Sequence, residues 1–127
     1  MDITNFKLAD KSEEGSVLTI VHPTEGFDTD IKIKLAGLDS HRYREYVRRI
    51  ANKRMANKKN AKQTFEQLEH QTAELFAMLT IDWEGIEENG SELPCNFENA
   101  MRIYLDPNLK FLVDQVDEFV NERSNFF

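Results

Sequence analysis

The sequence predicts an α+β fold that is mainly helical, with an N-terminal β-hairpin followed by about four α-helices. Two stretches rich in β-branched residues, 16–22 and 29–36, supply the strands. From residue 39 onward, apolar side chains recur every three or four residues, which is typical of helices with one buried face. The chain has 127 residues, of which 40% are hydrophobic, so we treat residues 1–127 as a single domain with a modest core.

The first third of the chain is expected to contain the hairpin, at residues 16–36. Residues 1–15 are mostly polar and predict an extended or frayed start. A Pro- and Gly-containing loop, 23–28, separates the two strands. The second strand alternates, which places three apolar residues on one face: Ile31, Ile33 and Leu35. Because an isolated hairpin is marginal in water, we expect this face to pack against a helix or a partner chain.

Residues 39–79 are predicted to form long helices. Asp39 is a suitable N-cap, and apolar residues follow at helical spacing from Tyr43 onward. Residues 57–60 contain no apolar side chain, which indicates either a short break between two helices or an exposed turn of one long helix. The helical pattern resumes at Ala61 and continues to Leu79.

Residues 80–97 are predicted to be a connector, and residues 98–122 two C-terminal helices. The connector holds the only Trp and the turn signal Asn89-Gly90, where both residues tolerate a positive φ. Trp83 has two interpretations: a core or hinge anchor, which we favour, or a partner-facing hot spot. Asn96 is the expected cap of the first C-terminal helix. Asp106, followed by a proline, is the expected cap of the second.

The net charge of −7 is distributed very unevenly. Residues 1–40 carry −4, residues 41–62 carry +8, and residues 63–127 carry −11. The basic stretch is either an ordinary solvated helix face or a surface for an acidic partner: nucleic acid, another protein, or a neighbouring copy of the chain. Opposite charges on one chain also permit head-to-tail self-association. The candidate partner-binding residues of this stretch are Arg42, Arg48, Arg49, Lys53 and Arg54.

The chain ends in two aromatic residues, Phe126 and Phe127. Two aromatic side chains at a chain end are harder to bury than two within a helix, so they are further candidates for partner binding. The alternative is that they fold back onto the domain.

Catalytic and metal-binding patterns are poor. The three His lie in different predicted elements, and Cys95 has no nearby His or Cys, so we interpret it as a small connector residue. The acidic residues around Asp82 match a calcium-binding loop in neither register. The sequence therefore predicts no enzyme, cofactor or metal site. There is no apolar run of about 18 residues and no signal peptide, so we expect no membrane span and no export.

The connector also carries a family resemblance. Its segments Asp82-Trp83-Glu84-Gly85-Ile86, Asn89-Gly90, Leu93-Pro94 and Asn96-Phe97-Glu98-Asn99 resemble the "W-x-G-hydrophobic … (D/N)-G … P-hydrophobic-(T/N)-F … N" signature of tail-assembly chaperones of long-tailed bacteriophages. The resemblance covers about half of the chain, from Thr64 onward. We expect its motif positions to be structural: Trp83, Gly85, Asn89, Gly90, Pro94 and Phe97.

The resemblance implies a non-enzymatic protein of the host cell cytoplasm. Members of this family bind the long helical tape-measure protein and help to recruit tail-tube subunits around it. In many phages a longer form arises by ribosomal frameshifting. Such work requires apolar surfaces that accept amphipathic helices. The alternative is a nucleic-acid-binding helical domain that uses residues 42–62. We disfavour it because the acidic flanks would repel DNA.

Overall fold

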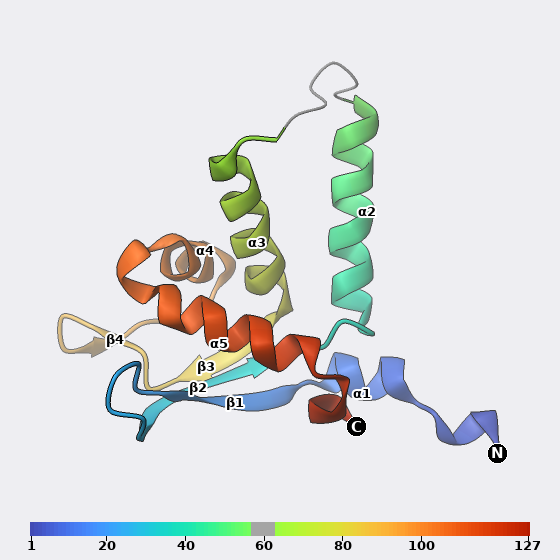
Figure 1. Ribbon diagram of the computed structural model, residues 1–127, viewed down its shortest axis with the longest axis horizontal. Helices are drawn as coiled ribbons and strands as arrows, with labels where there is room; N and C mark the ends of the chain where they lie inside the picture. Colours follow the sequence, from blue (N-terminus) through green and yellow to red (C-terminus); the bar gives the residue numbers. More distant parts are fainter. Residues whose placement is uncertain (57–62) are drawn as a thin grey trace.

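The computed structural model describes residues 1–56 and 63–127, and it confirms the α+β, mainly helical class (Figure 1). The strands β1 (Ser16–Val21), β2 (Asp28–Leu35) and β3 (Thr80–Glu84) form an antiparallel sheet in the order β1-β2-β3. Four longer helices follow the hairpin: α2 (His41–Ala56), α3 (Phe65–Leu79), α4 (Phe97–Leu105) and α5 (Lys110–Asn121). The choice between a break and a turn at residues 57–60 lies outside the described residues.

The N-terminal region is helical, which corrects the prediction of an extended or frayed start. A 3-10 turn, Ile3–Asn5, is followed by α1 (Leu8–Glu14), so the hairpin is not strictly N-terminal. Ser12 holds α1 in place: it is 1% exposed, and its carbonyl oxygen accepts from the N–H of Gly37 at 3.0 Å. The predicted frayed start was wrong because these contacts are tertiary and leave no periodic pattern in a short polar segment.

The predicted hairpin is present, and it gains a third strand. The β1–β2 register runs from Ser16↔Leu35 to Val21↔Asp28, with an irregularity before Val21. The predicted connector begins instead with β3, which pairs with β2. This strand was missed because it follows α3 directly, without an intervening turn signal. The Asn89-Gly90 turn is confirmed, with φ of 53° and 83° between the short strands β4 (Glu87–Glu88) and β5 (Ser91–Glu92).

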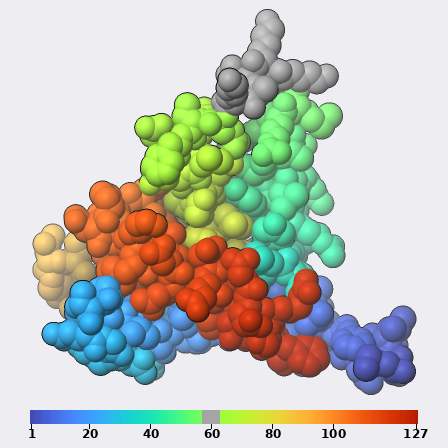
Figure 2. Space-filling view, viewed as in Figure 1, coloured from blue at the N-terminus to red at the C-terminus, as the bar shows by residue number. Residues whose placement is uncertain are grey.

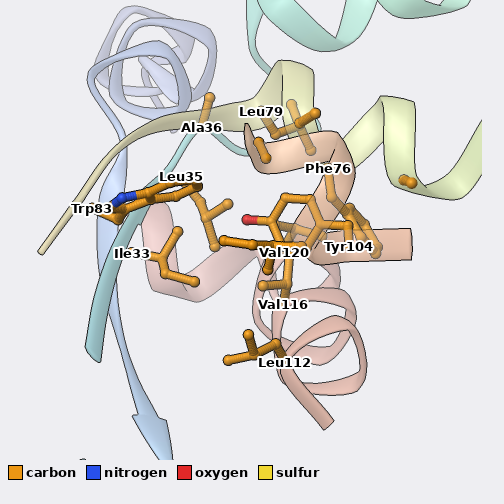
Figure 3. Close-up of a cluster of buried hydrophobic side chains, with 14 of the residues drawn as sticks. Ile33, Leu35, Ala36, Phe76, Leu79, Trp83, Tyr104, Leu112, Val116 and Val120 are labelled. Carbon is orange, nitrogen blue, oxygen red and sulfur yellow. The ribbon is translucent and has the colours of Figure 1, made fainter. Parts of the chain in front are cut away.

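The core lies between one face of the sheet and the helices (Figure 3). Side chains of the sheet and of α3, α4 and α5 meet there, among them Ile33, Leu35, Phe76, Leu79, Trp83, Tyr104, Val116 and Val120. The apolar face of the hairpin therefore packs against helices of its own chain. Trp83 is 6% exposed, and its indole N–H donates to the carbonyl oxygen of Leu93 at 2.8 Å, as expected for a core anchor.

Of the three predicted helix caps, only Asn96 caps the helix for which it was predicted. Asn96 accepts from the backbone N–H of Asn99, and Asp106 caps a 3-10 turn, Pro107–Leu109, that leads into α5. The prediction of Asp39 as the cap of α2 was wrong, because Ser40 accepts from the N–H of Tyr43 at 3.2 Å.

Candidate protein-binding surface

α2 and the first half of α3, residues 65–72, project from the rest of the molecule, and we call them the helical arm. In Figure 2 their green atoms rise above the remaining elements. None of the residues of α2 is buried. The apolar side chains of the first half of α3 are also accessible: Phe65 is 72% exposed and Leu68 is 48% exposed. The helical arm therefore presents apolar surface that its own chain leaves uncovered.

One apolar stripe runs along the whole of α3. In the second half of the helix it belongs to the core, where Phe76 is 2% exposed and Leu79 is fully buried. In the first half the same stripe continues through Phe65 and Leu68 into solvent. The exposed half begins with a capping box between Thr64 and Gln67. The exposed stripe thus lies on a helix whose N-terminal end is stabilised by capping hydrogen bonds.

Arg42, the first of the candidate cations, has an intramolecular role. Its guanidinium donates to the carbonyl oxygens of Met78 and Thr80, each at 3.3 Å. These carbonyl groups lie at the end of α3, where a cation is electrostatically favourable. Arg42 therefore ties the base of α2 to α3.

Arg49 and Lys53 also face α3. They lie 3.4 and 3.8 Å from the carboxylate of Glu74, a residue that is only 5% exposed. Tyr46 completes this contact by donating from its hydroxyl to the carbonyl oxygen of Gln71 at 3.1 Å. Partial burial, followed by the nearby charge of Glu74, raises the pKa of Tyr46. These three side chains hold α2 against α3.

The remaining cations project from the opposite side of α2. Arg48 pairs with Glu45 on its own helix at 2.8 Å. Within the described part of the chain, Arg44 and Arg54 have no carboxylate within salt-bridge distance. Residues spaced three, four and seven positions apart share one side of a helix. On this basis we define the outer face of α2 by five exposed residues: Arg44, Val47, Arg48, Ala51 and Met55.

The two C-terminal aromatic residues lie in different environments. Phe126 is 7% exposed and packs edge-on against Phe119, with ring centroids 5.5 Å apart. Phe127 is 61% exposed, and the ammonium of Lys11 lies 4.5 Å from its ring centroid. The structure thus folds Phe126 back onto the domain, the alternative left open for both residues, and leaves Phe127 accessible.

The motif residues of the connector mostly support the backbone. Gly85 has φ of 82°, and a Cβ there would clash with the carbonyl oxygen of Asp30, so the close approach of β3 to β2 requires glycine. The carbonyl oxygen of Pro94 accepts from the side chain of Asn99 at 2.9 Å, before α4 begins. Phe97 differs from the others because it is a large apolar residue that is 46% exposed.

A groove of about 810 Å³ between β1 and α5 was not predicted from the sequence. Half-buried apolar residues of both elements line it: Leu18, Val21 and Phe119. Three exposed acidic residues also line it: Asp117, Glu118 and Glu122. The groove joins segments that lie 94 residues apart at Val21 and Gln115, so no local pattern marks it.

Candidate metal ligands do not gather among residues 1–56 and 63–127. No three His, Cys, Asp or Glu side chains in these ranges come together as metal ligands. Cys95 borders a second cavity of about 240 Å³, and burial raises the pKa of its thiol, which disfavours the reactive thiolate. No helix in the described part of the chain is long and apolar enough to cross a membrane.

Comparison with known proteins found no family model, no curated protein and no solved structure that matches the chain.

Proposed function

We propose that this chain is a non-enzymatic tail-assembly chaperone of a long-tailed bacteriophage, acting in the host cell cytoplasm. Its partner would be the tape-measure protein, which is a long helical protein in the family that the sequence resembles. The observation that carries the binding part of the proposal is the stripe of α3. Its second half packs in the core, and its first half leaves Phe65 and Leu68 exposed.

The exposed half of the stripe suits an amphipathic helix. α4 already packs against α3, which shows that α3 accepts a helical neighbour (Figure 1). A partner helix would extend this packing along residues 65–72, by the helix-in-groove mode of recognition.

The contact should be weak at any single position. Full burial of a Phe or Leu side chain contributes about 1.5–3 kcal/mol, and the loss of freedom on association offsets much of that. A long partner with many amphipathic turns can bind many copies, each of which is easily released. That property fits a chaperone, which must leave when the tail tube assembles.

The second proposed partner is the tail-tube protein. α4 exposes Phe97 at 46% and Leu105 at 41%. These residues lie on a different helix from Phe65 and Leu68, so two partners need not compete for the same side chains.

Co-expression with the tape-measure protein of the same phage tests the proposal. We expect the tape-measure protein to become soluble and to co-elute with the chain on a sizing column, and tail-tube subunits to join the complex when they are added. If the tape-measure protein precipitates regardless, and the chain binds duplex DNA with a steep salt dependence, the chaperone proposal is wrong and the nucleic-acid alternative replaces it.

A further inference from the structure

The groove between β1 and α5 combines apolar and acidic surface. Leu18, Val21 and Phe119 form its apolar part. Among the described residues, no Lys, Arg or His lies within 4.0 Å of the carboxylates of Asp117 and Glu118. A ligand for this groove should therefore carry cations and apolar side chains on one face.

Glu122 adds a third carboxylate to the same groove. It accepts hydrogen bonds from the hydroxyl and backbone N–H of Ser124, at 2.8 and 3.3 Å. These bonds lower its pKa, so it stays ionised at neutral pH. Glu122 thus contributes a negative charge to the groove at neutral pH.

The outer face of α2 has the complementary composition. Arg44 and Arg48 lie one helical turn apart, and Val47 and Met55 lie on the same side of the helix. Val47 is 45% exposed and Met55 is 71% exposed. Exposed apolar and basic side chains therefore occur together on one helical surface, as the groove requires.

We propose that the chain associates head to tail, with the outer face of α2 of one copy docked in the β1–α5 groove of the next copy. The occupant is a second copy because each chain carries both complementary surfaces. A chain cannot fill its own groove, since Arg49, Lys53 and Arg42 fix α2 against α3. Heterologous contacts of this kind close into rings or continue as open chains of subunits.

The association depends on salt. Exposed ion pairs are individually weak and are screened within about 10 Å at 0.1 M salt. The apolar contacts of Val47 and Met55 persist, so rising salt weakens the assembly without abolishing it. This behaviour distinguishes the interface from general aggregation, which salt favours.

Sedimentation equilibrium of the full chain, with two charge-reversed variants, tests this interface. The arm variant carries Arg44→Glu and Arg48→Glu, and the groove variant carries Asp117→Lys and Glu118→Lys. Each variant alone should associate at least about tenfold more weakly than the wild type, because like charges then face each other across the interface. An equimolar mixture should recover association, since each reversed surface then meets an opposite charge.

Two single reversals on other surfaces are the controls, Lys7→Glu and Glu25→Lys, and both should associate like the wild type. Unchanged thermal unfolding shows that all variants are folded. The proposal is overturned if the wild type is monomeric throughout, if either double variant associates normally, or if the mixture fails to recover. A monomeric wild type that binds duplex DNA through Arg44 and Arg48 would assign the outer face of α2 to nucleic acid instead. Each of these results is independent of tape-measure binding through α3.

Discussion

Gln115 on α5 binds both backbone groups of Val21 at the end of β1. The N–H of Val21 donates to the side-chain oxygen of Gln115 at 2.8 Å, and the side-chain nitrogen of Gln115 donates to the carbonyl oxygen of Val21, also at 2.8 Å. One amide side chain therefore pairs with the edge strand as another strand would, and it fixes α5 beside the sheet.

Replacing Gln115 should destabilise the fold through this contact. Gln115→Ala leaves two partly buried backbone groups of Val21 unpaired, and we expect the free energy of unfolding to fall by about 1–3 kcal/mol. Urea unfolding measures the change. Glu118→Gln, at an exposed position of the same helix, is the control and should change stability by less than about 0.5 kcal/mol. Equal stability of the two variants would show that the amide contact is unimportant.

Alanine substitutions at Gly85 and Gly90 distinguish the cost of backbone strain from the cost of a steric clash. Both have a positive φ, 82° and 83°, but only a Cβ at Gly85 would clash, with the backbone of Asp30. We expect Gly90→Ala to cost about 1 kcal/mol from backbone strain alone. Gly85→Ala should cost at least about 1 kcal/mol more, because β3 must move away from β2. Equal costs in urea unfolding would contradict the close approach of these strands.

Tyr104 should couple stability to alkaline pH. Its hydroxyl lies 2.7 Å from that of Thr80, which itself donates to the carbonyl oxygen of Phe76, so the Tyr104 hydroxyl is the donor. Burial raises the pKa of Tyr104 far above its ordinary value of 10.0. The stabilisation is complete below pH 10.0, and it is lost as pH rises further because only the unfolded state releases the proton.

The variant Tyr104→Phe tests this linkage. At neutral pH it should lose about 1 kcal/mol of stability, the net contribution of one hydrogen bond. Above pH 10.0 its stability should fall less steeply than that of the wild type. Parallel pH profiles of urea unfolding would show that Tyr104 ionises in the folded protein.

The two terminal aromatic residues should differ sharply in their contribution to stability. Phe126→Ala removes a ring packed against Phe119 and should cost about 3 kcal/mol. Phe127→Ala removes an exposed ring that interacts with Lys11 and should cost less than about 1 kcal/mol. Thermal unfolding compares them. Similar melting temperatures for the two variants would mean that the tail is not folded against the domain.

The fold was predictable where sequence periodicity reflects burial. The alternation of Ile31, Ile33 and Leu35 located β2, and the capping residue Asn96 located α4. Asp106 was expected to cap the last helix, but it caps the 3-10 turn before α5, which has no side-chain cap of its own. α1 and β3 were missed for different reasons. α1 is held by tertiary hydrogen bonds of Ser12, and β3 is a short strand that directly follows a helix. Neither arrangement leaves a local pattern in the sequence.

The candidate binding surface was only partly predictable, because charge and apolar content do not reveal intramolecular partners. The basic stretch was identified, but Arg42, Arg49 and Lys53 of that stretch contact α3. The helical spacing of Phe65 and Leu68 predicts that they share a buried face with Phe76, yet both are exposed. Their exposure depends on how far along α3 the packed core extends, which is a property of the tertiary structure.

The central claim is that the first half of α3 binds the tape-measure protein. The most direct test is co-expression of that protein with the variant Phe65→Ser plus Leu68→Ser, read as soluble yield and co-elution. Phe6→Ser, at a 48% exposed position distant in sequence from the arm, is the control. We predict that the double variant folds but leaves the tape-measure protein insoluble, while Phe6→Ser keeps it soluble. A folded double variant that still solubilises and co-elutes with the tape-measure protein would contradict the account.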